Sequence, residues 1–265
     1  MKRMSGLVVA GAAMCLCGVL VGCKPDAAVR QGAVIGRGTK AVVSPLDPAT
    51  LGDLEGTVKF VGKPPARVQI DMSQDPACGM SGGGDNYSEQ YVVHDSGLAN
   101  VYVYVKSGPA VALTAPATTT TPVVMDQIGC RYSPHVIALM RGGSVEFRNS
   151  DVTMHNIHTM PVTVGEQAID VSQGPKGAPK QVTFDHAEMM IPVRCNNHPW
   201  MNAFINVAET PFFAVTDANG HFEIKGLPAG KYVLGAVHEK LGEQTLNLTV
   251  AAHETAKASF SYSMK

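Results

Sequence analysis

The apolar residues of this chain recur in short runs, and that spacing constrains the fold more than any other feature. After the first 22 residues, no segment carries apolar residues at the period of a long helix. Many short segments instead combine β-branched, aromatic and aliphatic residues between turn-forming residues, which is typical of strands. These segments are residues 56–62, 100–106, 136–140, 144–148, 154–158, 181–185, 190–195, 203–207 and 232–237. The sequence therefore predicts an all-β fold built as sandwiches.

One segment, residues 191–201 with the sequence I-P-V-R-C-N-N-H-P-W-M, gathers three metal-ligand side chains. Cys195 offers a thiolate, His198 an imidazole and Met201 a thioether. A blue-copper site uses two histidines and one cysteine in a plane, with a long axial methionine. The segment would thus supply three of four ligands, and His155, in N-S-D-V-T-M-H-N-I-H about forty residues earlier, is the candidate for the fourth.

Two other interpretations of these residues are less favoured than copper. A Cys-x-x-His pair also occurs in structural zinc sites, but those usually use more than one thiolate, and no second cysteine lies near Cys195 in the sequence. His158 is a second histidine near His155, but residues three apart on a strand face opposite sides. We therefore expect one copper ion held with His155, and a structural role for His158.

The motif C-N-N-H-P-W-M, preceded by M-H-N-I-H, resembles the copper-binding motif of the cupredoxins, and most closely that of the amicyanins. The resemblance covers residues 136–207 and implies a Greek-key sandwich with one type 1 copper. By this resemblance the copper ligands are His155, Cys195, His198 and Met201. It also implies that Asn156 hydrogen-bonds across to the cysteine loop, a contact of the kind that tunes a metal's potential.

The same resemblance implies a route for electrons. In the family, the histidine equivalent to His198 lies at the surface within an apolar patch, and here Pro199 and Trp200 follow it. We expect these three residues to form the electron-transfer surface, at which redox protein partners would dock briefly. The partner of a known family member does not carry over, because this chain has well over a hundred residues outside the matched region.

The start of the chain has the pattern of a secretory signal, with two basic residues followed by an apolar run. Leu20-Val21-Gly22-Cys23 resembles the bacterial lipobox, which implies cleavage after residue 22 and acylation of Cys23. The alternative is an ordinary signal cut elsewhere. We expect residues 23–53, rich in small residues and proline, to form a flexible tether between the membrane lipid and the folded protein, on the extracytoplasmic side of a bacterial envelope.

Cys78 and Cys130 are the two cysteines that the predicted signal, lipid anchor and copper site leave unassigned. In an oxidising compartment we expect them to form a disulfide, the alternative being two separately buried thiols. Loss of residues 1–22 removes two basic residues and no acidic ones, which moves the formal net charge from −1 to −3. That charge argues against nucleic acid as a partner, since phosphate binding needs clustered Lys and Arg.

The C-terminal segment T-D-A-N-G-H-F-E-I-K-G-L-P-A-G-K-Y resembles carboxypeptidase regulatory-like, transthyretin-like β-sandwiches, which are related to carbohydrate-binding modules. The resemblance implies a spacer or docking module, with glycan contact as a weak expectation. Asn219-Gly220 predicts a hairpin. G-T-V-K-F-V-G near residue 56 resembles the first strand of the same sandwich, so a cupredoxin domain at 111–208 would be inserted between parts at 54–110 and 209–265. Two consecutive domains are the alternative.

The remaining motifs predict no enzyme. His238-Glu239 is interpreted as a surface pair, because adjacent strand residues point to opposite faces, and residues 162–180 as an exposed loop. No H-E-x-x-H zinc-protease motif occurs. The predicted function is a membrane-anchored carrier of single electrons. The alternatives are a lipoprotein that stores or delivers copper through its methionines, and a structural or carbohydrate-docking envelope protein.

Overall fold

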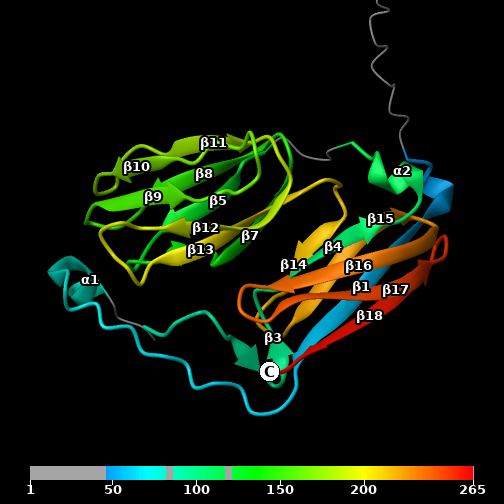
Figure 1. Ribbon diagram of the computed structural model, residues 1–265, viewed down its shortest axis with the longest axis horizontal. Helices are drawn as coiled ribbons and strands as arrows, with labels where there is room; N and C mark the ends of the chain where they lie inside the picture. Colours follow the sequence, from blue (N-terminus) through cyan, green and yellow to red (C-terminus); the bar gives the residue numbers. More distant parts are fainter. Residues whose placement is uncertain (1–45, 82–85, 117–120, 265) are drawn as a thin grey trace, which may run out of the picture. The chain divides into compact units, whose positions relative to one another are not determined.

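The computed structural model describes residues 46–81, 86–116 and 121–264, and strands dominate them (Figure 1). The predicted all-β class is confirmed. The other elements described are a 3-10 helix at Pro48–Thr50 and two short α-helices, α1 (Pro76–Ser81) and α2 (Ala110–Leu113). None of these is long and apolar enough to cross a membrane. The predicted signal, the lipobox cysteine Cys23 and most of the predicted tether lie outside the described residues.

The middle of the sequence forms two sheets, which we call the central sandwich. Their strand orders are β10-β9-β12-β13-β7 and β11-β8-β5-β6. The strands are β5 (Val123–Gln127), β6 (Tyr132–Ser133), β7 (Val136–Met140), β8 (Gly143–Asn149), β9 (His155–Thr159), β10 (Asp170–Gln173), β11 (Lys180–Phe184), β12 (Glu188–Arg194) and β13 (Asn202–Ala208). Alternate residues such as Val145 and Phe147 on β8 are fully buried, because successive strand side chains point to opposite faces.

The core of the central sandwich extends beyond its own strands. Fully buried members include Phe147, Ile157, Ile191 and Ile205. The same cluster takes in Met72 and Cys78, which come from the segment around α1 that precedes the sandwich in the sequence. That segment therefore packs onto the central sandwich through buried side chains, although it contributes no strand to its sheets.

The two ends of the described chain form two further sheets, which we call the terminal sandwich. One sheet has the order β15-β1-β3-β2, with β18 also paired to β1, and the other β14-β4-β16-β17. The strands are β1 (Leu51–Phe60), β2 (Val93–His94), β3 (Gly97–Leu98), β4 (Tyr102–Ser107), β14 (Phe213–Val215), β15 (His221–Pro228), β16 (Gly230–His238), β17 (Gly242–Val250) and β18 (Thr255–Tyr262). Its buried core has no member in common with the core of the central sandwich.

Strand β1 pairs with strands from the other end of the described chain. It runs antiparallel to β15 and parallel to β18, and its burial alternates along nearly its whole length. This pairing is what the insertion hypothesis requires, since the central sandwich lies between these strands in the sequence. Strand β1 begins at Leu51, so the predicted tether boundary at residue 53 falls inside it. The family of the terminal sandwich stays a prediction.

The predicted hairpin at Asn219-Gly220 is wrong in its pairing. The turn forms, and Asp217 Oδ1 accepts hydrogen bonds from the Asn219 and His221 amides at 2.9 Å each. However, β14 before it pairs with β4, and β15 after it pairs with β1, so the turn leads from one sheet to the other. Gly220 has a φ of +74°, and a Cβ there would lie 2.3 Å from the Val58 carbonyl oxygen, so both backbone angle and space require glycine.

The interpretation of His238-Glu239 as a surface pair is also wrong. The Glu239 side chain is only 2% exposed, and its Oε1 lies 2.6 Å from Nε2 of the equally buried His135. His238 is 1% exposed, and burial lowers its pKa to about 4. His135 lies one residue before β7 and 104 residues from Glu239 in the sequence. This long-range contact buries Glu239, which strand alternation alone would leave in solvent.

Candidate metal centre

Three of the four predicted ligands meet at one end of the central sandwich. His155 is the first residue of β9, Cys195 follows β12 directly, and His198 lies in the loop from β12 to β13. Strands β9 and β12 are paired, with Arg194 opposite His158, so the backbone sets the separation of the first two ligands. His155 Nδ1 lies 3.0 Å from His198 Nδ1, which in turn lies 3.4 Å from Cys195 Sγ.

The donor atoms of His155, Cys195 and His198 all lie within 4.8 Å of one another, and the three side chains are buried. The loop that holds Cys195 and His198 is short and hydrogen-bonded to itself. The amide of Cys195 donates to the Met201 carbonyl at 3.3 Å, and the amide of Met201 donates to the His198 carbonyl at 2.9 Å. Met201 is 1% exposed and belongs to the same buried cluster as Cys195.

Cys195 is held as a thiolate in this setting. Burial raises the pKa of its thiol, but hydrogen bonds from His155, His198 and the amides of Asn156 and Asn197 outweigh burial and lower that pKa to about 6. The Asn156 amide donates to Cys195 Sγ at 3.3 Å. Since the thiolate is the form that binds metal, the surrounding donors prepare Cys195 for that role.

Each histidine of the cluster has a carboxylate on its outer nitrogen. His155 Nε2 lies 2.8 Å from Asp151 Oδ2, and His198 Nε2 lies 2.9 Å from Asp75 Oδ2. Burial lowers the pKa of His155, but Asp151 and Cys195 outweigh it and raise that pKa to about 9. The Nε2–H that donates to a carboxylate holds the ring in one orientation, so a metal would bind at Nδ1 in place of the second ring proton.

A second set of hydrogen bonds fixes the cysteine loop. Asn156 Oδ1 accepts from the Asn196 amide at 3.3 Å, which is the contact across to the loop that the sequence analysis expects. Asn156 Nδ2 donates to Asp170 at 2.7 Å, and Asn196 Nδ2 donates to the same carboxylate. Asp170 is on β10, whereas residues 162–180 were predicted to be a loop. His158 lies on the outside of this network, 3.0 Å from Asn196 Oδ1.

The donor set fits copper better than the alternatives. Two imidazole nitrogens and one thiolate converge in a buried site, and a buried thioether follows in the same loop. Thiolate and thioether are soft ligands that select copper, whereas structural zinc sites are filled mainly by several thiolates and imidazoles. The Cys78 and Cys130 sulfurs lie close to the histidines of the site but are joined in a disulfide, so Cys195 is the free thiol among the described residues.

The predicted electron-transfer surface differs from the structure in one respect. Pro199 is exposed and Trp200 is half-buried, but His198 is only 3% exposed. Asp75 covers its Nε2, and the Trp200 ring lies 5.1 Å from the imidazole, centroid to centroid. Asp75 was missed by the sequence analysis. Asp151 was missed too, although an acidic residue four positions before a candidate histidine ligand is a sequence signal for a carboxylate partner.

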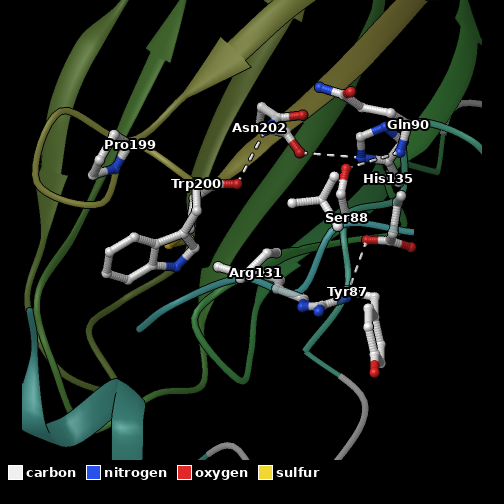
Figure 2. Close-up of a pocket in the computed structure, with 12 residues that line it drawn as sticks. Tyr87, Ser88, Gln90, Arg131, His135, Pro199, Trp200 and Asn202 are labelled. Carbon is white, nitrogen blue, oxygen red and sulfur yellow. Dashed lines mark hydrogen bonds and ion pairs between the residues drawn. The ribbon is translucent and has the colours of Figure 1, made fainter. Parts of the chain in front are cut away.

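A pocket of about 270 Å³ lies beside the metal-binding loop (Figure 2). Pro199 and Trp200 line one side of it, and Tyr87, Ser88 and Gln90 line the other. Two polar groups of its lining contact each other, since the Asn202 backbone oxygen lies 3.1 Å from His135 Nδ1. Pro199 and Trp200 therefore contribute accessible surface next to the candidate metal centre.

No protein-family model and no curated protein matches the chain. Solved structures match part of it. An amicyanin variant in its Cu(I) form is 20% identical over 40% of this chain and 98% of that one, with a TM-score of 0.30. The purple cupredoxin from Nitrosopumilus maritimus is 19% identical over 32% of this chain and 99% of that one, with a TM-score of 0.28.

The copper-containing nitrite reductase from Thermus scotoductus is 26% identical over 36% of this chain, with a TM-score of 0.31. This chain matches only 24% of that enzyme's length. The similarity to cupredoxins thus concerns about 40% of the chain. At these TM-scores, the assignment of the metal centre depends on its own donor atoms and their burial.

Proposed function

We propose that the chain is a membrane-anchored blue-copper protein that carries single electrons between protein partners outside the cytoplasm. The buried convergence of His155 Nδ1, His198 Nδ1 and Cys195 Sγ supports this proposal most directly. Met201, buried in the same loop, would supply a thioether as the fourth ligand. Copper held by these residues supplies a one-electron couple between Cu(II) and Cu(I).

The protein's part in electron transfer is to keep the ligands still. His155 and Cys195 lie at the ends of paired strands, and the loop carrying His198 and Met201 closes on itself through backbone hydrogen bonds. The thiolate is stabilised by amide donors before any metal binds. Ligands held in this way change position little when one electron arrives or leaves, which is what rapid electron transfer requires.

Partners are proposed to dock at the surface formed by Pro199 and Trp200 beside the pocket of Figure 2. A small surface of this kind suits brief contact rather than a permanent complex. The terminal sandwich serves as a spacer or docking module, with glycan contact as the binding that its resemblance implies. The proposal assigns no catalytic residue.

A second candidate function is storage or delivery of Cu(I). Met154, next to His155, is 49% exposed, so a soft ligand is accessible near the centre, and Met189 at the far end of β12 is 43% exposed. Methionine in β-rich proteins more often fills core space, yet these two side chains do not. Delivery would require that the reduced ion leave the site, whereas a carrier must keep it.

Voltammetry of the copper-loaded protein distinguishes the two functions. A carrier gives a reversible one-electron wave that persists over many cycles with the copper content unchanged. Stepwise loss of copper on reduction, measured as metal released to a Cu(I) chelator, supports delivery instead. A protein that takes up no copper in equilibrium dialysis contradicts both and favours the structural or carbohydrate-docking alternative.

The membrane anchor is proposed from Leu20-Val21-Gly22-Cys23, which lies outside the described residues. Acyl chains on Cys23 would each add about 0.8 kcal/mol per buried methylene. The disulfide between Cys78 and Cys130 favours an oxidising compartment for the folded part.

Cys23→Ala should abolish incorporation of labelled palmitate and leave the protein uncleaved or soluble, because the acylated thiol is removed. Incorporation is measured in membrane fractions of cells expressing each variant. Cys17→Ala, six residues upstream in the same apolar segment, is the matched control and should be labelled like the parent. Equal labelling of the Cys23 variant and the parent would show that the lipid is absent or lies elsewhere.

A further inference from the structure

His198 is covered by a side chain from a distant part of the chain. Asp75 lies 123 residues earlier, one residue before α1. Its Oδ2 accepts from Thr153 Oγ1 at 3.0 Å and lies 2.9 Å from His198 Nε2, while its Oδ1 accepts from the Ala77 amide at 2.8 Å. A carboxyl group of ordinary pKa is ionised at neutral pH, so His198 Nε2 faces a negative charge.

The segment that carries Asp75 is attached to the central sandwich at two buried points. Met72 is 4% exposed within the core cluster of that sandwich, and Cys78 is fully buried. Cys78 is disulfide-bonded to Cys130. Residues 71–81 therefore lie over the metal centre as a covalently attached cover, which we call the cap.

The disulfide also connects the two carboxylate–histidine pairs. The Cys130 amide donates to Asp151 Oδ2 at 2.8 Å, and this carboxylate holds His155. The Cys130 carbonyl accepts from Trp200 Nε1 at 3.2 Å. A single residue thus joins the cap, the carboxylate behind His155 and the aromatic ring that packs on His198.

A charged carboxylate on the outer nitrogen of a metal-bound imidazole has a predictable electrostatic effect. It makes the ring a stronger donor, and it places a negative charge near the metal in a site that is largely closed to water. Both effects stabilise Cu(II) more than Cu(I), because the oxidised ion carries the larger positive charge. Loss of the charge should therefore raise the reduction potential.

We propose that Asp75 is a positioning residue that orients His198 for copper and favours the oxidised ion, and that the cap shields His198 from solvent and from direct contact with partners. This inference rests on the proposed function for the part that concerns copper, whereas the shielding is a property of the chain itself. Partners then meet the centre at Trp200 and not at the imidazole edge.

Two variants distinguish the effect of the Asp75 charge from the effect of the side chain covering His198. Asp75→Asn keeps the shape and removes the charge, so the ratio of Cu(I) to Cu(II) at a fixed potential should rise about tenfold, equivalent to 59 mV for one electron. Asp75→Ala removes both, and should in addition weaken copper binding by about 10- to 100-fold. Potentials are measured by voltammetry and affinities by competition with a chelator, on the full chain in detergent.

Shielding is measured without copper. Metal-free protein is treated with diethyl pyrocarbonate, which acylates accessible imidazoles, and modified peptides are mapped by mass spectrometry. His198 should react at least tenfold more slowly than His158 in the same sample, since the His158 side chain is 33% exposed. The difference should persist in Asp75→Asn and largely disappear in Asp75→Ala.

Asp71→Asn is the matched control, because it removes a charge from the same cap at an exposed site, where Asp71 bonds to the amide and the side chain of Ser73. It should change neither potential nor labelling. Rapid labelling of His198 in the parent overturns the cap, and an unchanged potential in Asp75→Asn overturns the positioning role. A colourless parent with a protected His198 contradicts the proposed function alone, so the two failures are distinguishable.

Discussion

Cys195→Ser should abolish the intense visible absorption that we expect from the oxidised, copper-loaded protein. That colour arises from charge transfer between a thiolate and Cu(II), and a serine hydroxyl cannot supply the thiolate. In the parent, hydrogen bonds lower the Cys195 pKa to about 6, so the thiolate is present at neutral pH. The measurement is a titration of metal-free protein with Cu(II), followed by visible spectroscopy of the parent and the variant.

Companion variants test the ligand set. His158→Ala should keep the colour, because His158 bonds to Asn196 outside the cluster. Met201→Gln should keep it too but lower the potential, since a thioether favours Cu(I) relative to an amide oxygen. Colour retained in His155→Ala but lost in His158→Ala would overturn the assignment. A parent that stays colourless with excess Cu(II) would contradict the electron-carrier proposal itself.

The ligand cluster was predictable because its determinants are local. Cys195, His198 and Met201 fall within seven residues, and their spacing alone brings three donor types into one loop. His155 needed one further assumption, that a strand bearing it pairs with the strand before Cys195, and β9 and β12 do pair. The Asn156 contact is a consequence of the same pairing, since it links β9 to the residue after Cys195.

The cover over the centre was not predictable in the same way. Asp75 reaches His198 across 123 residues, and no periodic pattern around it marks a site. Its position depends on burial of Met72 and Cys78 against the central sandwich, a tertiary property. Likewise β10, with the sequence Asp-Val-Ser-Gln, lacks the β-branched and aromatic content of a typical strand and forms at the edge of its sheet by pairing with β9.

The Asn219-Gly220 turn and the His238-Glu239 pair illustrate the same limit. The local sequence predicts the turn correctly. The flanking strands β14 and β15, however, pair with β4 and β1, which lie more than a hundred residues away in the sequence. Alternation correctly places adjacent residues on opposite faces. Strand alternation alone does not predict that His135, from the central sandwich, contacts Glu239 and buries its side chain. Long-range packing, and not a failure of local rules, accounts for both differences.

Cys78→Ala combined with Cys130→Ala should lower the free energy of unfolding by about 4 kcal/mol, because the bridge closes a loop with a sequence separation of 52 and restricts the unfolded chain. Alanine is preferred to serine here, since both sites are fully buried and a hydroxyl would lack partners. The single tryptophan of the chain, Trp200, donates to the Cys130 carbonyl, so its fluorescence reports unfolding at this site during a urea titration of metal-free protein.

Reductant provides the control for this comparison. Adding reductant should lower the free energy of unfolding of the parent by a similar amount and leave that of the double variant unchanged. If the loss in the double variant came from cavities at the two alanines, reductant would not reproduce it in the parent. Alkylation before reduction, followed by mass spectrometry, should find no free thiol at Cys78 or Cys130. If the bridge also holds the cap, then His198 in the folded double variant should react with diethyl pyrocarbonate faster than in the parent. Two alkylated thiols in the untreated parent, with a stability insensitive to reductant, would contradict the bridge. The cap would then be held by the packing of Met72 and by the hydrogen bonds of Asp75.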